Sequence, residues 1–80
     1  MPRFYINVRN GMGYSHDAEG RDLPDLETAR NEALEGAREL MAAELREGRT
    51  LRLSDTVEIE DADRRQLLIL PFREAVRIEN

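Results

Sequence analysis

The chain has 80 residues, a formal net charge of −5 and no cysteine. This length corresponds to one domain with a thin core, and the cysteine count excludes disulfides and thiolate metal sites. The negative charge argues against a phosphate backbone as the main partner, because such binding depends on Lys and Arg. There is no apolar run of the roughly 20 residues that a membrane span needs and no signal-peptide pattern. We therefore expect a cytoplasmic protein.

Residues 3–9 alternate between polar and apolar side chains, with aromatic and β-branched residues among them. This pattern predicts a half-buried strand. Asn10 and Gly11 follow, and this pair is a strong hairpin signal because both residues tolerate positive φ. A second strand is predicted over about residues 12–17.

The length of the hairpin loop decides which face the second strand presents. If Asn10 and Gly11 form a two-residue loop, Tyr14 and His16 lie on the outer face together with Tyr5. A three-residue loop would turn Tyr14 and His16 inward, because a slip of one residue exchanges the two faces. Both registers remain open at this stage.

Residues 25–48 predict one long amphipathic helix, preceded by a polar connection over residues 17–24. Asp25 suits the N-cap, where its carboxylate accepts from free backbone amides, and Gly48 suits the position after the C-terminus. Gly36 weakens the helix by about 1 kcal/mol relative to alanine. The apolar stripe has helical spacing and small residues that would let the helix lie close to a sheet. It consists of Leu26, Ala29, Ala33, Leu34, Ala37, Leu40, Met41 and Leu45.

The last third of the chain predicts a second hairpin. Residues 56–60 alternate and predict a strand, residues 61–64 predict a turn, and residues 66–70 predict a strand that Pro71 ends. Residues 72–76 predict a short helical turn. The segment between the helix and this hairpin, residues 49–55, has no clear pattern.

The predicted order is β-β-α-β-β across residues 1–80 as a single domain. Antiparallel hairpins packed against one helix give an α+β two-layer sandwich, with the helix on one face of the sheet. The short C-terminal helical turn completes the predicted architecture.

The strand over residues 66–70 carries four apolar side chains in succession, so it is apolar on both faces. One helix covers one face of a sheet, so either Leu68 and Leu70 or Leu67 and Ile69 lack a partner within the chain. This favours a dimer or partner interface. The alternative is a central strand whose outer face is shielded by the C-terminal tail and residues 49–55. The expected contacts of a homodimer are Tyr5, Tyr14, Leu68 and Leu70.

We find no pattern for catalysis, a cofactor or a metal. His16 is the only histidine, and its neighbour Ser15 points to the opposite face of a strand. Residues 61–63 begin like a calcium loop, but Arg64 and Arg65 stand where oxygen ligands and the turn glycine are needed. We therefore expect that the protein is not an enzyme. The candidate anion or nucleic-acid contacts are Arg64, Arg65, Arg73 and Arg77.

The whole chain resembles a family of short bacterial proteins of unknown function that is typical of alphaproteobacteria. That family begins Met-Pro-Arg-Tyr/Phe-Phe/Tyr and ends Pro-Phe-Arg-Asp/Glu-Ala. Members often have an apolar pair where this chain has Tyr14 and Ser15, and a glycine where it has Arg64. The segments that carry the resemblance are residues 1–5, 10–11, 17–20, 23–26, 29–40 and 71–75. The resemblance implies the fold and no activity.

A weaker, fold-level similarity is to antitoxin domains of the HicB type. From the residues themselves we expect a non-catalytic, cofactor-free interaction or regulatory module that acts as a homodimer. Another protein partner is an option within that hypothesis. The alternative from a different class is an antitoxin-like regulator that contacts RNA or DNA. The negative net charge of the chain makes nucleic acid an unfavoured partner.

Overall fold

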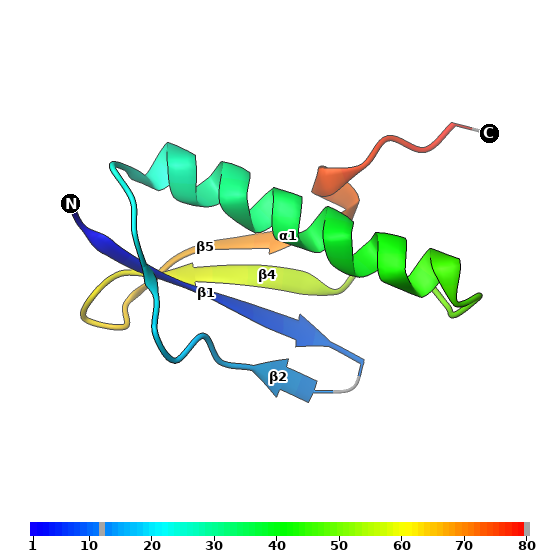
Figure 1. The fold of residues 1–80 in the computed structure, drawn as a ribbon, viewed down its shortest axis with the longest axis horizontal. Coiled ribbons are helices and arrows are strands. Elements are labelled where there is room, and N and C mark those ends of the chain that lie inside the picture. Colours follow the sequence, from blue (N-terminus) through cyan, green and yellow to red (C-terminus); the bar gives the residue numbers. More distant parts are fainter. Residues whose placement is uncertain (12, 80) are drawn as a thin grey trace.

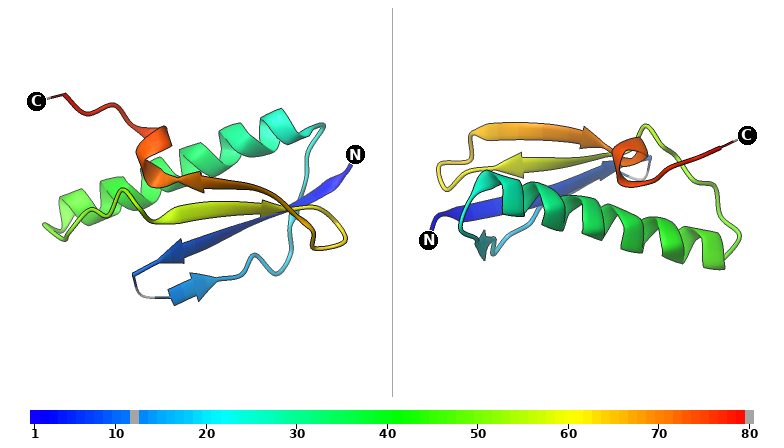
Figure 2. Two further views of the ribbon diagram at one scale, coloured as in Figure 1. Left: turned by 180° about the vertical axis from the view of Figure 1, so that it is seen from behind. Right: turned by 90° about the horizontal axis from the view of Figure 1, so that it is seen from above.

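The computed structural model describes residues 1–11 and 13–79. The helix α1 lies on one face of an antiparallel five-stranded sheet (Figures 1 and 2), so the predicted α+β class is confirmed. A two-residue strand, β3, was not predicted. The elements are β1 (Arg3–Asn10), β2 (Gly13–Ser15), β3 (Arg21–Asp22), α1 (Leu26–Arg46), β4 (Thr56–Glu60), β5 (Gln66–Pro71) and the 3₁₀ helix η1 (Phe72–Ala75).

The strand order is β2-β1-β4-β5, with β3 also paired to β1. The two central strands, β1 and β4, come from the first and last thirds of the chain and pair from Tyr5 opposite Glu60 to Arg9 opposite Thr56. On its other edge, β1 pairs with β2 near its end and with β3 near its start. The middle of that edge is therefore left without a strand.

The core lies between α1 and the centre of the sheet. Val57 and Ile59 of β4 are 1% and 0% exposed, whereas Ile6 and Val8 of β1 are only partly buried. The helix thus covers β4 completely and the β1 side incompletely. The buried core side chains are Phe4, Ala29, Ala33, Leu34, Ala37, Met41, Val57, Ile59, Leu70, Phe72 and Ala75.

Both ends of α1 are as predicted. The carboxylate of Asp25 accepts from the backbone N–H of Thr28 at 2.8 Å, and Gly48 follows the helix with a φ of 69°. The N–H of Gly48 donates to Leu45 O at 3.1 Å, and the N–H of Arg49 donates to Glu44 O at 2.9 Å. This pair of bonds is the Schellman arrangement that glycine favours at a helix end.

The predicted inner stripe of α1 is only partly correct. Its alanines, Leu34 and Met41 are buried, but Leu26, Leu40 and Leu45 are 36%, 44% and 64% exposed. The stripe is therefore not fully used by packing within the chain.

In the first hairpin, Asn10 pairs with Gly13 and Arg9 with Tyr14. The prediction that Asn10 lies in the loop is wrong, because Asn10 forms the last pair of the ladder. Part of the predicted second strand, Met12, lies outside the described residues. The observed pairing differs from the predicted two-residue loop by an even shift, so Tyr14 lies on the outer face as that prediction requires.

The turn between β4 and β5 is confirmed. The N–H of Arg64 donates to Asp61 O at 2.9 Å, and the N–H of Asp61 donates to Arg65 O at 2.9 Å. Arg64 has a φ of 65°, the only positive value among the described residues other than glycine. This is the turn position where a three-residue hairpin loop normally has glycine.

The exposed apolar pair of β5 is Leu67 and Ile69, which are 39% and 54% exposed. Leu70 is buried in the core and Leu68 packs partly against it, so the expectation that Leu68 and Leu70 face outward is wrong. β5 is an edge strand, so the alternative of a shielded central strand is also wrong. A register shift beside Ile59 places Leu67 as the extra residue of β5.

Residues 49–55 close one end of the core together with η1. The N–H of Phe72 donates to Asp55 O at 2.7 Å, and the N–H of Arg73 donates to Leu53 O at 3.1 Å. Leu51 and Leu53 pack against the core from this segment. The hydrogen bonds fix the path of a segment that has no pattern in the sequence.

Candidate functional site

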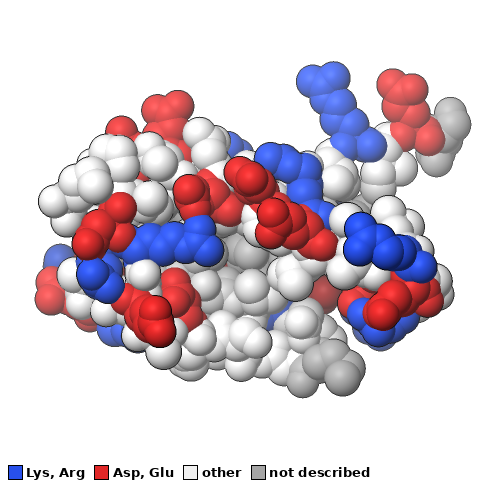
Figure 3. Space-filling model, in the orientation of Figure 1, with Lys and Arg blue, Asp and Glu red and all other residues white. Residues whose placement is uncertain are grey.

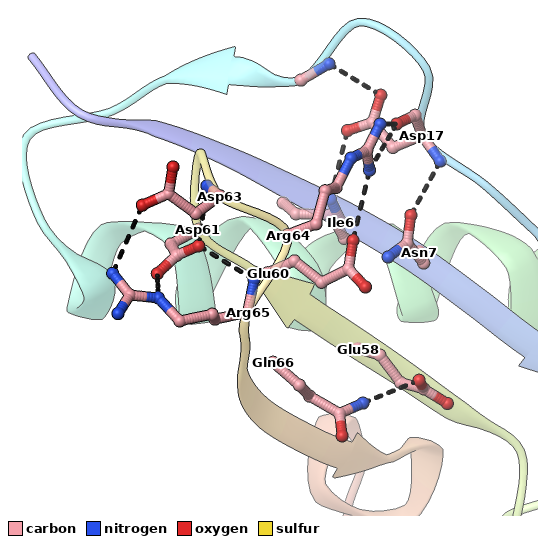
Figure 4. Close-up of polar contacts among 11 residues, drawn as sticks. Ile6, Asn7, Asp17, Glu58, Glu60, Asp61, Asp63, Arg64, Arg65 and Gln66 are labelled. Carbon is pink, nitrogen blue, oxygen red and sulfur yellow. Dashed lines mark hydrogen bonds and ion pairs between the residues drawn. The ribbon is translucent and has the colours of Figure 1, made fainter.

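Asp17 fills the gap on the edge of β1 between β2 and β3 (Figure 4). Its carboxylate accepts from the N–H of Ile6 at 3.1 Å and from the N–H of Gly20 at 3.0 Å. At the middle of β1, the Asp17 side chain therefore accepts the backbone hydrogen bond that a neighbouring strand would otherwise accept. Gly20 has a φ of 73°, and a Cβ there would lie 3.0 Å from Phe4 O, so this turn requires glycine.

The backbone of Asp17 joins two more parts of the fold. Its N–H donates to Asn7 Oδ1 at 2.8 Å, and its carbonyl accepts from both terminal nitrogens of Arg64 at 3.3 Å. Arg64 thereby connects the β4–β5 turn to the far edge of β1 (Figure 4). Burial raises the pKa of the Asp17 carboxyl, but backbone N–H groups, chiefly of Gly20 and Ile6, lower it by more, so the net shift is downward. Asp17 is thus an ionised acceptor that serves the structure.

The two tyrosines predicted as interface contacts each lie against an arginine of the same chain. The guanidinium carbon of Arg64 lies 3.5 Å from the ring centroid of Tyr5, and that of Arg9 lies 4.4 Å from the ring centroid of Tyr14. The ring of His16 meets Tyr14 edge-on with centroids 4.7 Å apart. Burial raises the pKa of the Tyr14 phenol. One face of each tyrosine ring is therefore already in contact with an arginine of the same chain.

Glu58 lies on the face of the sheet opposite α1 and is nonetheless buried. Its carboxylate accepts from Arg9 Nε at 2.8 Å, from Gln66 Nε2 at 2.9 Å and from Thr56 Oγ1 at 3.2 Å. Asn7, which pairs with Glu58 across β1 and β4, is buried beside it. Sequence reasoning missed this network because alternating polar residues on a strand are typical of a solvated face.

The four arginines predicted as an anion or nucleic-acid patch do not gather in one place. Arg64 and Arg65 lie on the β4–β5 turn, where they pair with nearby carboxylates. Arg73 and Arg77 lie in η1 and the tail, beyond the other end of β5 (Figure 1). The length of β5, about 20 Å at strand rise, separates the two pairs. Acidic and basic side chains are interspersed over the face that carries α1 (Figure 3).

A groove runs between α1 and the β1–β2 hairpin, and we call it the α1 groove. It encloses about 360 Å³. Its apolar floor and walls include Ile6, Val8, Ala33, Gly36 and Leu40. A mostly uncharged strip marks it between α1 and β2 (Figure 3).

The polar rim of the α1 groove includes His16, Arg21 and Glu32, and the last two form an ion pair. A second groove of about 420 Å³ lies nearer the end of α1 and also includes Leu40. Leu40 therefore lines both grooves. Sequence reasoning missed this surface because it assigned Leu40 to the core.

These features define a small α+β domain with a structural polar network and an apolar groove. Within residues 1–11 and 13–79 no cluster of His, Cys, Asp or Glu could hold a metal ion, and no described helix is long and apolar enough to cross a membrane. Residues 3–73 match the model of the family described as a domain of unknown function (DUF6894), and the chain belongs to this family. Neither a curated protein nor a solved structure matches it.

Proposed function

We propose that this protein is a non-catalytic interaction module that binds another polypeptide chain through the α1 groove and works as a homo-oligomer. The observation that carries this proposal is the incomplete cover that α1 gives to β1. Ile6 and Val8 face the helix side of the sheet but are only partly buried, and Leu40 beside them is 44% exposed. Apolar surface left open in this way on a small domain is typical of a contact site.

The face of the sheet opposite α1 is a weaker candidate for the contact. Glu58 is held by three donors of the chain, and Tyr5 and Tyr14 lie against Arg64 and Arg9. A partner that bound over these residues would have to displace interactions that are already formed. The proposed contact is therefore the α1 groove, and not the tyrosines and β5 that the sequence predicted.

The edge of β5 is also a weaker candidate. The extra residue, Leu67, interrupts its pairing at one end, and Pro71 removes a backbone donor at the other. Bulges and prolines on edge strands hinder the addition of another strand. The nucleic-acid alternative has no assembled patch to support it, because its four arginines lie at two ends of the sheet.

Site-specific photocrosslinking in cells tests the proposal. A photoreactive amino acid at position 40 should form covalent adducts with a polypeptide. The same group at position 45 should not, because Leu45 is exposed on α1 but lines neither groove. A folded protein that forms no adduct from position 40 would remove the α1 groove as a contact site.

A further inference from the structure

No contact within the described chain requires glycine at position 36. Glycine is among the least favourable residues in a helix interior, yet Gly36 lies in the middle of α1. Apart from its two chain neighbours and the adjacent backbone of α1, a Cβ built there meets no described atom within 4 Å. Packing within the chain therefore does not demand glycine at this position. Since Gly36 lines the α1 groove, its small size leaves room at the surface.

Leu40 supplies a side chain that fits such a space. It lies one helical turn after Gly36, lines the same groove and is partly exposed. A helix face that carries a recess and, one turn further on, a projecting leucine is complementary to a second copy of the same face. Two copies related by a two-fold axis would each place Leu40 over Gly36 of the other, as an isologous contact requires.

We propose that the occupant of the α1 groove is a second copy of this chain, with the two α1 helices antiparallel and Leu40 of each inserted over Gly36 of the other. Ile6 and Val8 would then be covered by the leucine of the second copy. This inference rests on the proposed function and specifies its partner and geometry.

The charges at the ends of the groove are compatible with this arrangement. Glu32 lies four positions before Gly36, and Glu44 lies four positions after Leu40. The two-fold axis places Glu32 of one copy beside Glu44 of the other. Each already has a guanidinium, since Glu32 pairs with Arg21 and Glu44 pairs with Arg49 at 2.9 Å. Each end of the contact would therefore hold two carboxylates and two guanidiniums. Opposite charges can alternate there without a net excess.

The available area is also sufficient. The 21 residues of α1 extend about 31 Å, and the helix with the two strands beside it is roughly 20 Å wide. A strip of these dimensions covers about 600 Å² before relief is counted, which is near the lower bound per partner for a stable interface. We therefore expect a dimer of modest affinity.

Substitutions at Gly36 separate the two roles of this residue. Gly36→Ala should raise the thermal midpoint of the monomer at low protein concentration, because alanine favours the helix. The same change should weaken self-association, and Gly36→Leu should weaken it further by filling the recess. Analytical ultracentrifugation over a wide concentration range measures the dimer dissociation constant. Gly36→Leu variants that associate as tightly as the parent protein would overturn the inference.

Leu40 has a matched control on the same helix. Leu40→Ala should raise the dimer dissociation constant by about tenfold or more, since each dimer loses two buried leucines. Leu45→Ala should leave the constant within about twofold, since this exposed leucine lies outside both grooves. Equal effects of the two substitutions would contradict the proposed contact.

Engineered cysteines test the geometry directly, because the described chain has no free cysteine of its own. A mixture of Gly36→Cys and Leu40→Cys chains should form the mixed disulfide faster than either chain forms a disulfide alone. Chains with Leu45→Cys should show no such preference. A monomer at every concentration would overturn the second-copy inference, as would adducts from position 40 only with a different protein. The latter result would leave the α1 groove standing as a binding site for another polypeptide, but not as a contact between copies of this chain, whereas a lack of all adducts would remove both.

Discussion

Replacement of Asp17 by alanine should destabilise the fold by about 2–4 kcal/mol. The carboxylate accepts from two backbone N–H groups, of Ile6 and Gly20. Each donor left without a partner in a partly buried position costs about 1–2 kcal/mol. A chain of this length has a total stability of roughly 4–12 kcal/mol, so the loss is a large share of it. Urea denaturation followed by circular dichroism measures the change.

Asp17→Asn tests the contribution of charge at nearly constant size. One side-chain oxygen becomes an NH₂ group that would face a backbone N–H, so this variant should also be clearly destabilised. The folded-state pKa of Asp17 is lowered, below an unfolded value of about 3.9. The stabilisation from its ionised form is therefore fully present above that value and is lost as the pH falls through the folded pKa. The difference between the parent and Asp17→Asn should shrink below about pH 4.

A surface aspartate in the same segment gives the control. Asp22 forms an exposed ion pair with Arg3, so Asp22→Asn should change the stability by no more than about 0.5 kcal/mol. The reasoning about Asp17 would be refuted if Asp17→Ala cost as little as this control. A difference between parent and Asp17→Asn that did not change with pH would refute the part that depends on ionisation.

Three further comparisons use the same denaturation assay. Arg64→Gly should be more stable than Arg64→Ala by about 1 kcal/mol, because both lose the guanidinium and only glycine relieves the positive φ of 65°; equal stabilities would contradict this. Gly20→Ala should cost more than Gly48→Ala, since both have positive φ but only a Cβ added at Gly20 would lie 3.0 Å from Phe4 O, whereas one added at Gly48 meets nothing within 4 Å; the reverse order would be inconsistent with that close approach. Leu70→Ala should lower the free energy of unfolding by about 2–5 kcal/mol and Ile69→Ala by less than about 1 kcal/mol. A reversed ranking would contradict the burial of Leu70.

Local signals in the sequence were sufficient for the helix and the β4–β5 turn. The N-cap at Asp25 and the glycine after the helix act through bonds within a few residues, so they can be identified without the rest of the fold. The short strand β3 could not be identified in this way. It has two residues, and its pairing depends on β1 and on the turn that Asp17 and Gly20 form.

The face of β5 was predicted incorrectly for a different reason. Four successive apolar residues have no alternation, so periodicity cannot say which of them point to the helix. The extra residue at Leu67 decides the matter, and it is visible only in the pairing with β4. Leu40 was misassigned because helical spacing indicates which residues share a face but not how far a sheet extends beneath it.

The central position of β1 beside β4 has a consequence for folding during synthesis. Arg9 and Glu58, which are hydrogen-bonded across this pair, are 49 residues apart in the chain. After β1 leaves the ribosome, β2 and β3, its neighbours on one edge, follow soon. The helix α1 is complete before β4, the neighbour on the other edge, has been made. Closing so long a segment has an entropic cost that local contacts do not share. We therefore expect the helix to form early and the sheet to assemble last, once the C-terminal hairpin is available.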